Sequence, residues 1–119
     1  MGRVCVVRYM RYRNSYPART FIDGMPKGHR ERFFASAVRF ANDGRLPSDA
    51  MGHYLDPPYA EIYEFKPGGW RVFGFRHAQN LYLLSGAKKK NPKAQESDYI
   101  VAENMRVNFL SNLVPKRTK

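Results

Sequence analysis

The sequence has a single cysteine, no long apolar run and few acidic residues. Cys5 stands alone among 119 residues, so no disulfide can form within the chain and no zinc site can be built from cysteines. The apolar run at 4–7 is too short for the core of a signal peptide. No run approaches the roughly 20 apolar residues of a membrane-spanning helix. We therefore expect a cytoplasmic protein in a reducing compartment, with no membrane partner.

Basic residues outnumber acidic ones by two to one. Lys and Arg total 21 against 10 Asp and Glu, which gives a formal net charge of +11. Such a charge argues against a calcium-binding protein or a typical metabolic enzyme. It attracts polyanions, of which nucleic acid is the commonest in a cell, with anionic membrane surfaces as a lesser alternative.

Metal and cofactor motifs are also missing from the sequence. The three histidines, His29, His53 and His77, are too scattered to indicate a metal centre. The chain contains no HExxH, CxxC, phosphate-binding-loop or dinucleotide-binding glycine pattern. We therefore predict that the protein uses no metal and no cofactor.

The length and a hydrophobic share of 43% fit one domain over residues 1–119. Alternating and β-branched residues predict strands over 4–10, 60–66, 70–76 and 81–87, with a turn at 67–69 that makes a hairpin of the second and third. Apolar residues at three-and-four spacing predict helices from about 26 to 42, ending at Gly44, and from about 92 to 110.

Two segments, 11–24 and 48–59, are rich in Pro, Gly, Asn and Asp and are predicted to be irregular, the second with at most a short helix. The strand over 81–87 is continuously apolar, which favours a central place in the sheet. The predicted fold is α+β, a small antiparallel sheet of about four strands packed by an N-terminal helix region and a C-terminal helix.

Arg71 is expected to point toward the core. Successive strand residues face opposite sides, so Arg71 shares a face with Phe73 and Phe75. An arginine there needs a partner or an open sheet edge, and Glu64, across the turn, is the obvious partner. The pair has two interpretations: an ion pair that only steadies the hairpin, or part of a site in which the arginine holds phosphate.

Four lysines in six residues follow the last predicted strand, at Lys88, Lys89, Lys90 and Lys93. In a chain of this charge the run is either a solvated turn or a phosphate contact that offsets charge developing in a transition state. RNA cleavage would also need a general acid or base. The sequence offers His77, Tyr82, Tyr99 and Glu64 for that role, none with a diagnostic neighbour.

Residues 63–75, YEFKPGGWRVFGF, followed by the apolar run 81–87 and by KKKNP at 88–92, resemble the RelE/ParE toxin superfamily, and within it the HigB-like, phage-associated branch. The helix expected before Gly44 matches the family's long helix in place and length. The resemblance implies a RelE-like fold and a toxin of a type II toxin–antitoxin pair. It also implies a cognate antitoxin as partner, in a dimer or hetero-oligomer.

Many members of this superfamily are ribosome-dependent mRNA endonucleases that inhibit translation without a metal. In that reaction the RNA 2′-hydroxyl attacks the adjacent phosphate, and basic side chains stabilise the anion. The resemblance places the family's strand arginine at Arg71 and its basic residues at Lys88, Lys89 and Lys90, while Arg76 and His77 are added by proximity. The predicted catalytic residues are thus Arg71, Lys88, Lys90 and His77, and the predicted RNA-binding residues are Arg76, Lys89, Lys93 and Glu64.

The sequence departs from the family near its C-terminus. Members that cut mRNA often carry a histidine or tyrosine there for proton transfer, and residues 111–119 contain neither. Either His77 or Tyr99 takes that role, or the chain acts by binding alone. Two other functions therefore stay open: a non-catalytic inhibitor of a host protein such as DNA gyrase, and a basic nucleic-acid-binding module.

Overall fold

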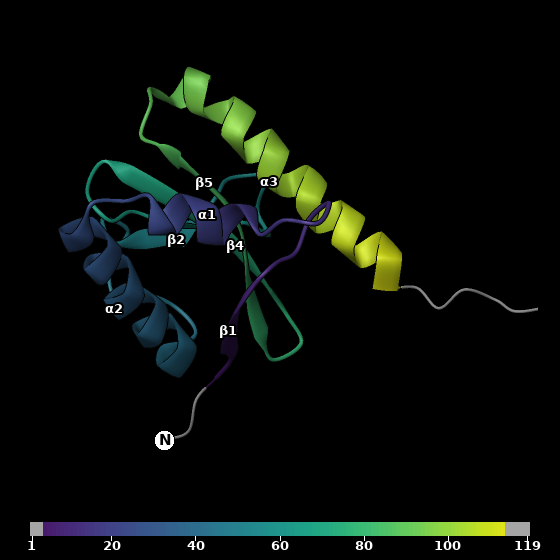
Figure 1. The fold of residues 1–119 in the computed structure, drawn as a ribbon, viewed down its shortest axis with the longest axis horizontal. Coiled ribbons are helices and arrows are strands. Elements are labelled where there is room, and N and C mark those ends of the chain that lie inside the picture. The colour runs from purple at the N-terminus through teal and green to yellow at the C-terminus, as the bar shows by residue number, and fades with distance from the viewer. Residues whose placement is uncertain (1–3, 114–119) are drawn as a thin grey trace, which may run out of the picture.

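The computed structural model of the chain describes residues 4–113 (Figure 1). In chain order its elements are β1 (Val6–Tyr9), α1 (Pro17–Asp23), α2 (Lys27–Asp43), β2 (Gly52–Tyr54), β3 (Tyr63–Phe65), β4 (Trp70–His77), β5 (Asn80–Lys88) and α3 (Pro92–Leu113). The basic tail 114–119, predicted to fray, lies outside the described residues. Within 4–113, none of the helices is long and apolar enough to cross a membrane.

The strands form one sheet in the order β1-β5-β4-β3-β2. Strands β2 to β5 pair antiparallel, as predicted for the last three, whereas β1 runs parallel to β5. The α+β class is confirmed, but in the described part of the chain the sheet has five strands and is mixed rather than antiparallel throughout. The parallel orientation of β1 could not be predicted, because no turn joins β1 to β5 and the local sequence pattern does not indicate how distant strands pair. Strand β2 was not predicted because three residues are too few to show alternation.

Helices cover both faces of the sheet (Figure 1). On one face Val72 and Leu83 pack with Phe33 of α2. On the other face Phe73 packs with Met105 of α3. Because both faces are covered, the central strands are almost continuously buried, and a charged residue within them requires a partner.

The ends of the two long helices agree with the sequence signals. Gly44 takes the left-handed conformation at φ 80°, and its N–H donates to the Phe40 carbonyl at 2.7 Å to end α2. At the start of α3, the Asn91 side chain accepts a hydrogen bond from the Ala94 N–H at 2.9 Å.

The segment 11–24, predicted to be irregular, contains the short helix α1. Pro17 begins this helix, because proline suits a first turn that needs no N–H donor, although the same residue is also typical of loops. Ile22 is buried and Phe21 lies directly over Gly86 of β5. Seven residues are too few to show a helical period, so packing against the sheet decides this element.

Candidate active site

A cleft of about 460 Å³ opens on the face of the sheet that α3 covers. Its walls come from β2 and the segment 55–59 that follows it, from β3 and β4, from the segment after β5 and from the first turns of α3. The charged and aromatic residues that line it are His53, Asp56, Tyr59, Glu64, Lys66, Arg71, Lys89, Lys90, Glu96 and Tyr99. The fold thus gathers four of the predicted site residues, Glu64, Arg71, Lys89 and Lys90, in one place.

Arg71 and Glu64 form a buried ion pair at the base of the cleft. Arg71 Nε lies 3.8 Å from Glu64 Oε2, and the side chains are 9% and 5% exposed. Arg71 Nη1 also donates to the carbonyls of Gly68 at 2.7 Å and Trp70 at 2.8 Å. Arg71 Nη2 has no hydrogen bond to the residues that the structure describes, so it can donate to a ligand in the cleft. The predicted inward orientation of Arg71, with Glu64 as its partner, is confirmed.

The second oxygen of Glu64 faces His53, a residue that sequence reasoning did not assign to the site. His53 Nε2 lies 3.6 Å from Glu64 Oε1, and His53 Nδ1 lies 2.7 Å from the Tyr54 carbonyl oxygen. A carbonyl only accepts, so Nδ1 carries a hydrogen and Nε2 is the bare nitrogen of the neutral ring. The imidazole and the carboxylate can therefore take up a proton between them.

Burial raises the pKa of Glu64 above its ordinary 4.5, and the positive charges of Arg71 and Lys66, together with that of His53 when its ring is protonated, oppose the rise. A carboxylate whose pKa moves toward neutrality is a better proton acceptor than an exposed one. The cause here is the closed position of Glu64 between β2 and β4, in the middle of β3.

Tyr99 lines the cleft from α3. With His77, it is one of the two residues that could transfer a proton in place of the missing C-terminal histidine or tyrosine. Burial, followed by the negative charge of Glu64, raises the pKa of Tyr99, so its hydroxyl keeps its proton at neutral pH. Its ring lies 5.8 Å from Phe73 and 5.7 Å from Tyr59. Tyr59 in turn donates its hydroxyl hydrogen to Glu96 Oε2 at 2.9 Å.

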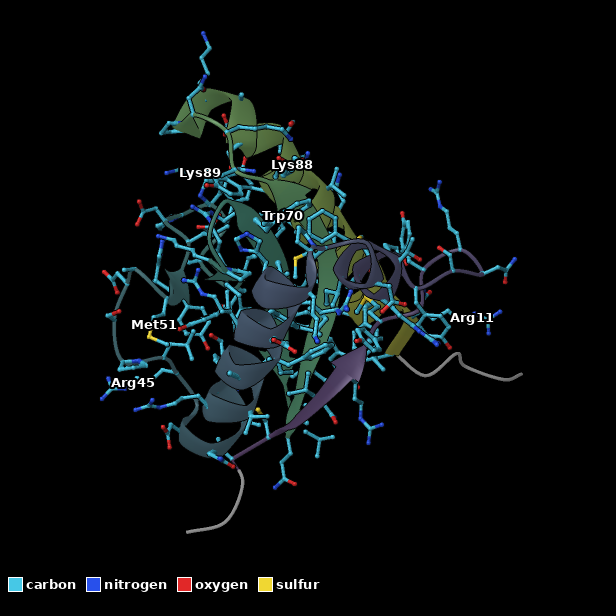
Figure 2. The ribbon with its side chains drawn as sticks, turned by 60° about the vertical axis from the view of Figure 1, so that its left-hand side comes forward. Arg11, Arg45, Met51, Trp70, Lys88 and Lys89 are labelled. Atoms are coloured by element: carbon cyan, nitrogen blue, oxygen red, sulfur yellow. The ribbon has the colours of Figure 1, made fainter. Side chains whose placement is uncertain are left out.

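The lysine run, whose first two members are labelled at the end of β5 in Figure 2, is divided between the two faces of the sheet. Lys89 lines the cleft. Lys90 also lines it, but its Nζ donates to Asp98 Oδ2 at 2.7 Å. Lys88 Nζ instead lies 5.1 Å from the centre of the Trp70 ring, among residues of the other sheet face. Lys93 is exposed on the first turn of α3 and does not line the cleft.

Arg76 and His77 lie at the opposite end of β4 from Arg71. His77 comes six positions after Arg71 along the strand, which is about 20 Å. The His77 ring lies 6.0 Å from the ring of Phe109 near the end of α3. The structure therefore does not bring these two residues into the cleft. Each residue along a strand adds more than three ångströms, so residues near each other in the sequence can lie far apart in space.

No protein-family model matches the chain, and no curated protein matches it. Among solved structures, a chain of the RelE–RelB complex from the archaeon Pyrococcus horikoshii OT3 has a TM-score of 0.53 at 13% identity, over 74% of this chain and 98% of that one. This chain has a RelE-like fold. A chain of the toxin–antitoxin complex RelBE2 from Mycobacterium tuberculosis has a TM-score of 0.44 at 20% identity, over 71% and 91% of the two chains. The RelE-like fold expected from the resemblance is confirmed by the first of these structures.

Proposed function

We propose that this chain is the toxin of a type II toxin–antitoxin pair, of the HigB-like branch, and a metal-independent, ribosome-dependent mRNA endonuclease that inhibits translation in the cytoplasm. The observation that carries the proposal is the cleft in which Arg71 and Lys89 stand beside the Glu64–His53 pair. Cations for a phosphate and a proton acceptor with a raised pKa are the two groups that cleavage by a 2′-hydroxyl requires.

The Glu64–His53 pair supplies the general base. The 2′-oxygen of the substrate attacks the adjacent phosphorus, and its proton passes to Glu64 or to Nε2 of His53. The bond from phosphorus to the 5′-oxygen then breaks, leaving a 2′,3′-cyclic phosphate on one fragment. His53 stays oriented throughout, because its Nδ1 is held by the Tyr54 carbonyl.

Arg71 and Lys89 stabilise the charge that develops on the phosphate. The Arg71 head is already fixed by Gly68, Trp70 and Glu64, so little reorganisation is needed when the anion forms. Lys88 and Lys93 would add a more distant positive field, since they lie outside the cleft.

Tyr99 is the residue placed to protonate the leaving 5′-oxygen. Its hydroxyl is the proton donor within the cleft whose pKa is raised by burial and by Glu64. This arrangement would replace the C-terminal histidine or tyrosine that many members of the superfamily carry, with a donor from the first half of α3.

An antitoxin protein is the proposed partner, and the fold offers a surface for it. A groove of about 470 Å³ between β1 and α2 is lined mainly by apolar side chains, with Phe34 and Val38 exposed. β1 is an edge strand of the sheet. The backbone N–H groups of Val6 and Met10 form hydrogen bonds on the β5 side, so the N–H groups of Val7 and Tyr9 face the open edge. An extended antitoxin segment could pair with this open edge, with its apolar side chains in the groove. Acidic residues on either side of that segment would complement Arg8 and the +11 net charge of the chain.

The deciding experiment maps mRNA ends by primer extension in a reconstituted translation reaction, with a parallel reaction that lacks ribosomes. We expect codon-spaced cuts that require ribosomes and that Arg71→Lys makes at most about one hundredth as fast. Intact mRNA during growth arrest would contradict the endonuclease and favour a non-catalytic inhibitor, with DNA damage as the sign of gyrase. Affinity for any RNA or DNA without cleavage or arrest would favour a nucleic-acid-binding module.

A further inference from the structure

A third, smaller hollow of about 230 Å³ lies between α2 and the turn that follows β3. Three cations line it, Arg32 and Arg39 from α2 and Lys66 from the end of β3, and its other lining residues are uncharged. A hollow with positive charge and no carboxylate in its wall has the chemistry of an anion site.

The cations of this hollow are poorly neutralised by the protein itself. Arg39 Nε lies 3.6 Å from Asp43 Oδ2, one turn along α2, and both side chains are more than half exposed. Within residues 4–113, neither Arg32 nor Lys66 has a carboxylate within ion-pair distance. Three like charges around one hollow repel each other, and a bound anion would remove that repulsion.

The hollow and the active-site cleft meet at the turn 66–69. Lys66 lines both of them. Arg32 approaches the same turn, since a β-carbon placed on Gly68 would lie 3.6 Å from Arg32 Nη1. The carbonyl of Gly68 accepts the hydrogen bond from Arg71 Nη1 at 2.7 Å. Arg32 and Arg71 therefore flank one short turn.

The spacing of Arg32 and Arg39 suits a polymer with repeated negative charges better than a single small anion. Arg32 and Arg39 are seven residues apart on α2, which places them on one side of the helix and about 10 Å apart along its axis. Figure 2 shows Met51, which also lines the hollow, beside α2, and Lys89 of the cleft at the end of β5. Lys66, which lines both spaces, connects the cations of the cleft with Arg32 and Arg39 on α2.

We propose that this hollow binds backbone phosphates of RNA that runs past the cleft, so that hollow and cleft form one phosphate track through Arg39, Arg32, Lys66 and Arg71. The identity of the anion as RNA rests on the proposed function. Phosphate binding at α2 itself requires no cleavage, and the two can be tested separately. The phosphates can belong to the mRNA or to ribosomal RNA, and the experiment has an arm for each.

The test compares the double variant Arg32→Gln/Arg39→Gln with wild type in binding to a 2′-O-methyl RNA oligonucleotide, which cannot be cut by 2′-hydroxyl attack, and to purified ribosomes. Affinity is measured at several salt concentrations. Arg19→Gln is the matched control, because Arg19 is equally exposed, makes the same one-turn ion pair with Asp23 at 3.9 Å and lies outside the hollow. A third protein, Arg32→Lys/Arg39→Lys, retains the charge, and thermal melts verify that each variant folds.

We expect the double glutamine variant to bind more weakly. The negative slope of log affinity against log salt should decrease in magnitude by about 1.4, because each of the two lost single-strand phosphate contacts contributes about 0.7. Arg19→Gln and the lysine variant should keep the wild-type slope. A reduced slope with the oligonucleotide assigns the hollow to the substrate strand, and one seen with ribosomes alone assigns it to ribosomal RNA. An unchanged slope in both arms, or no wild-type binding, would overturn the proposal. A reduced slope without any mRNA cleavage would overturn the endonuclease and leave the phosphate site.

Discussion

His53 and Glu64 meet across neighbouring strands with Nε2 and Oε1 3.6 Å apart, while the other Glu64 oxygen faces Arg71. The register places the two residues directly opposite each other on β2 and β3. One carboxylate thus contacts both a titratable ring and a permanent cation. This arrangement holds the base of the proposed reaction next to the group that binds its phosphate.

The pH dependence of cleavage should follow Glu64. Burial raises its pKa above 4.5, and a general base must be unprotonated, so the rate should fall as the pH drops through that raised value. Glu64→Gln should lower the cleavage rate on the order of a hundredfold or more and remove this acid limb. Single-turnover rates on programmed ribosomes across the acid range measure both effects, and an unchanged limb in Glu64→Gln would assign the base elsewhere.

Arg71 should be replaceable by lysine for folding but not for cleavage. Arg71→Ala leaves Glu64 buried without its partner, a change that costs about 3–5 kcal/mol of stability. Arg71→Lys keeps the charge but loses the planar group that joins Gly68, Trp70 and a ligand, and should cut at most about one hundredth as fast. Urea denaturation separates the two effects, and full activity in Arg71→Lys would contradict the role of the guanidinium.

Tyr99 and His77 can be separated by single substitutions. Tyr99→Phe removes a hydroxyl from the cleft and preserves the ring contacts with Phe73 and Tyr59, so cleavage should slow by tenfold or more while the fold is kept. His77→Ala changes a residue about 20 Å along β4 from Arg71 and should leave the rate near wild type. The opposite order of effects would return the proton-transfer role to His77.

The groove between β1 and α2 should be required for neutralisation but not for toxicity. Val38 is 60% exposed and lines the groove, so Val38→Asp should fold normally and place a negative charge where an acidic antitoxin segment docks. We expect at least a tenfold weaker complex with the protein encoded beside this gene, measured by calorimetry, and unchanged mRNA cleavage. Glu31→Gln, on the same helix but outside the groove, is the control.

The packing of α1 onto the sheet depends on Gly86. A β-carbon at this position would collide with the Phe21 ring, so Gly86→Ala should destabilise the protein by about 1–3 kcal/mol through overpacking. Gly69→Ala is the control, because a β-carbon there meets nothing within 4 Å. Urea denaturation midpoints, compared at an unchanged denaturant dependence, give the difference in unfolding free energy between the two variants. Equal midpoints would mean that α1 can shift away from β5 without loss of stability.

Local pattern was sufficient for the long elements. The apolar period of α2, the alternation around the turn 67–69 and the helix end at Gly44 are all properties of neighbouring residues, and these predictions are confirmed. The parallel pairing of β1 and the helix α1 were missed, because each is stabilised by contacts with β5, more than sixty residues away in the chain.

For the site, the positive charge, the inward orientation of Arg71 and its pairing with Glu64 follow from the sequence, since a strand fixes which residues share a face. Which other groups join them depends on the packing of the whole chain. It placed His53 and Tyr99 in the cleft, turned Lys88 toward Trp70 and left His77 at the far end of β4. No segment alone contains this information, because the site forms where separate strands and a helix meet, and their register is set by packing over the whole sheet.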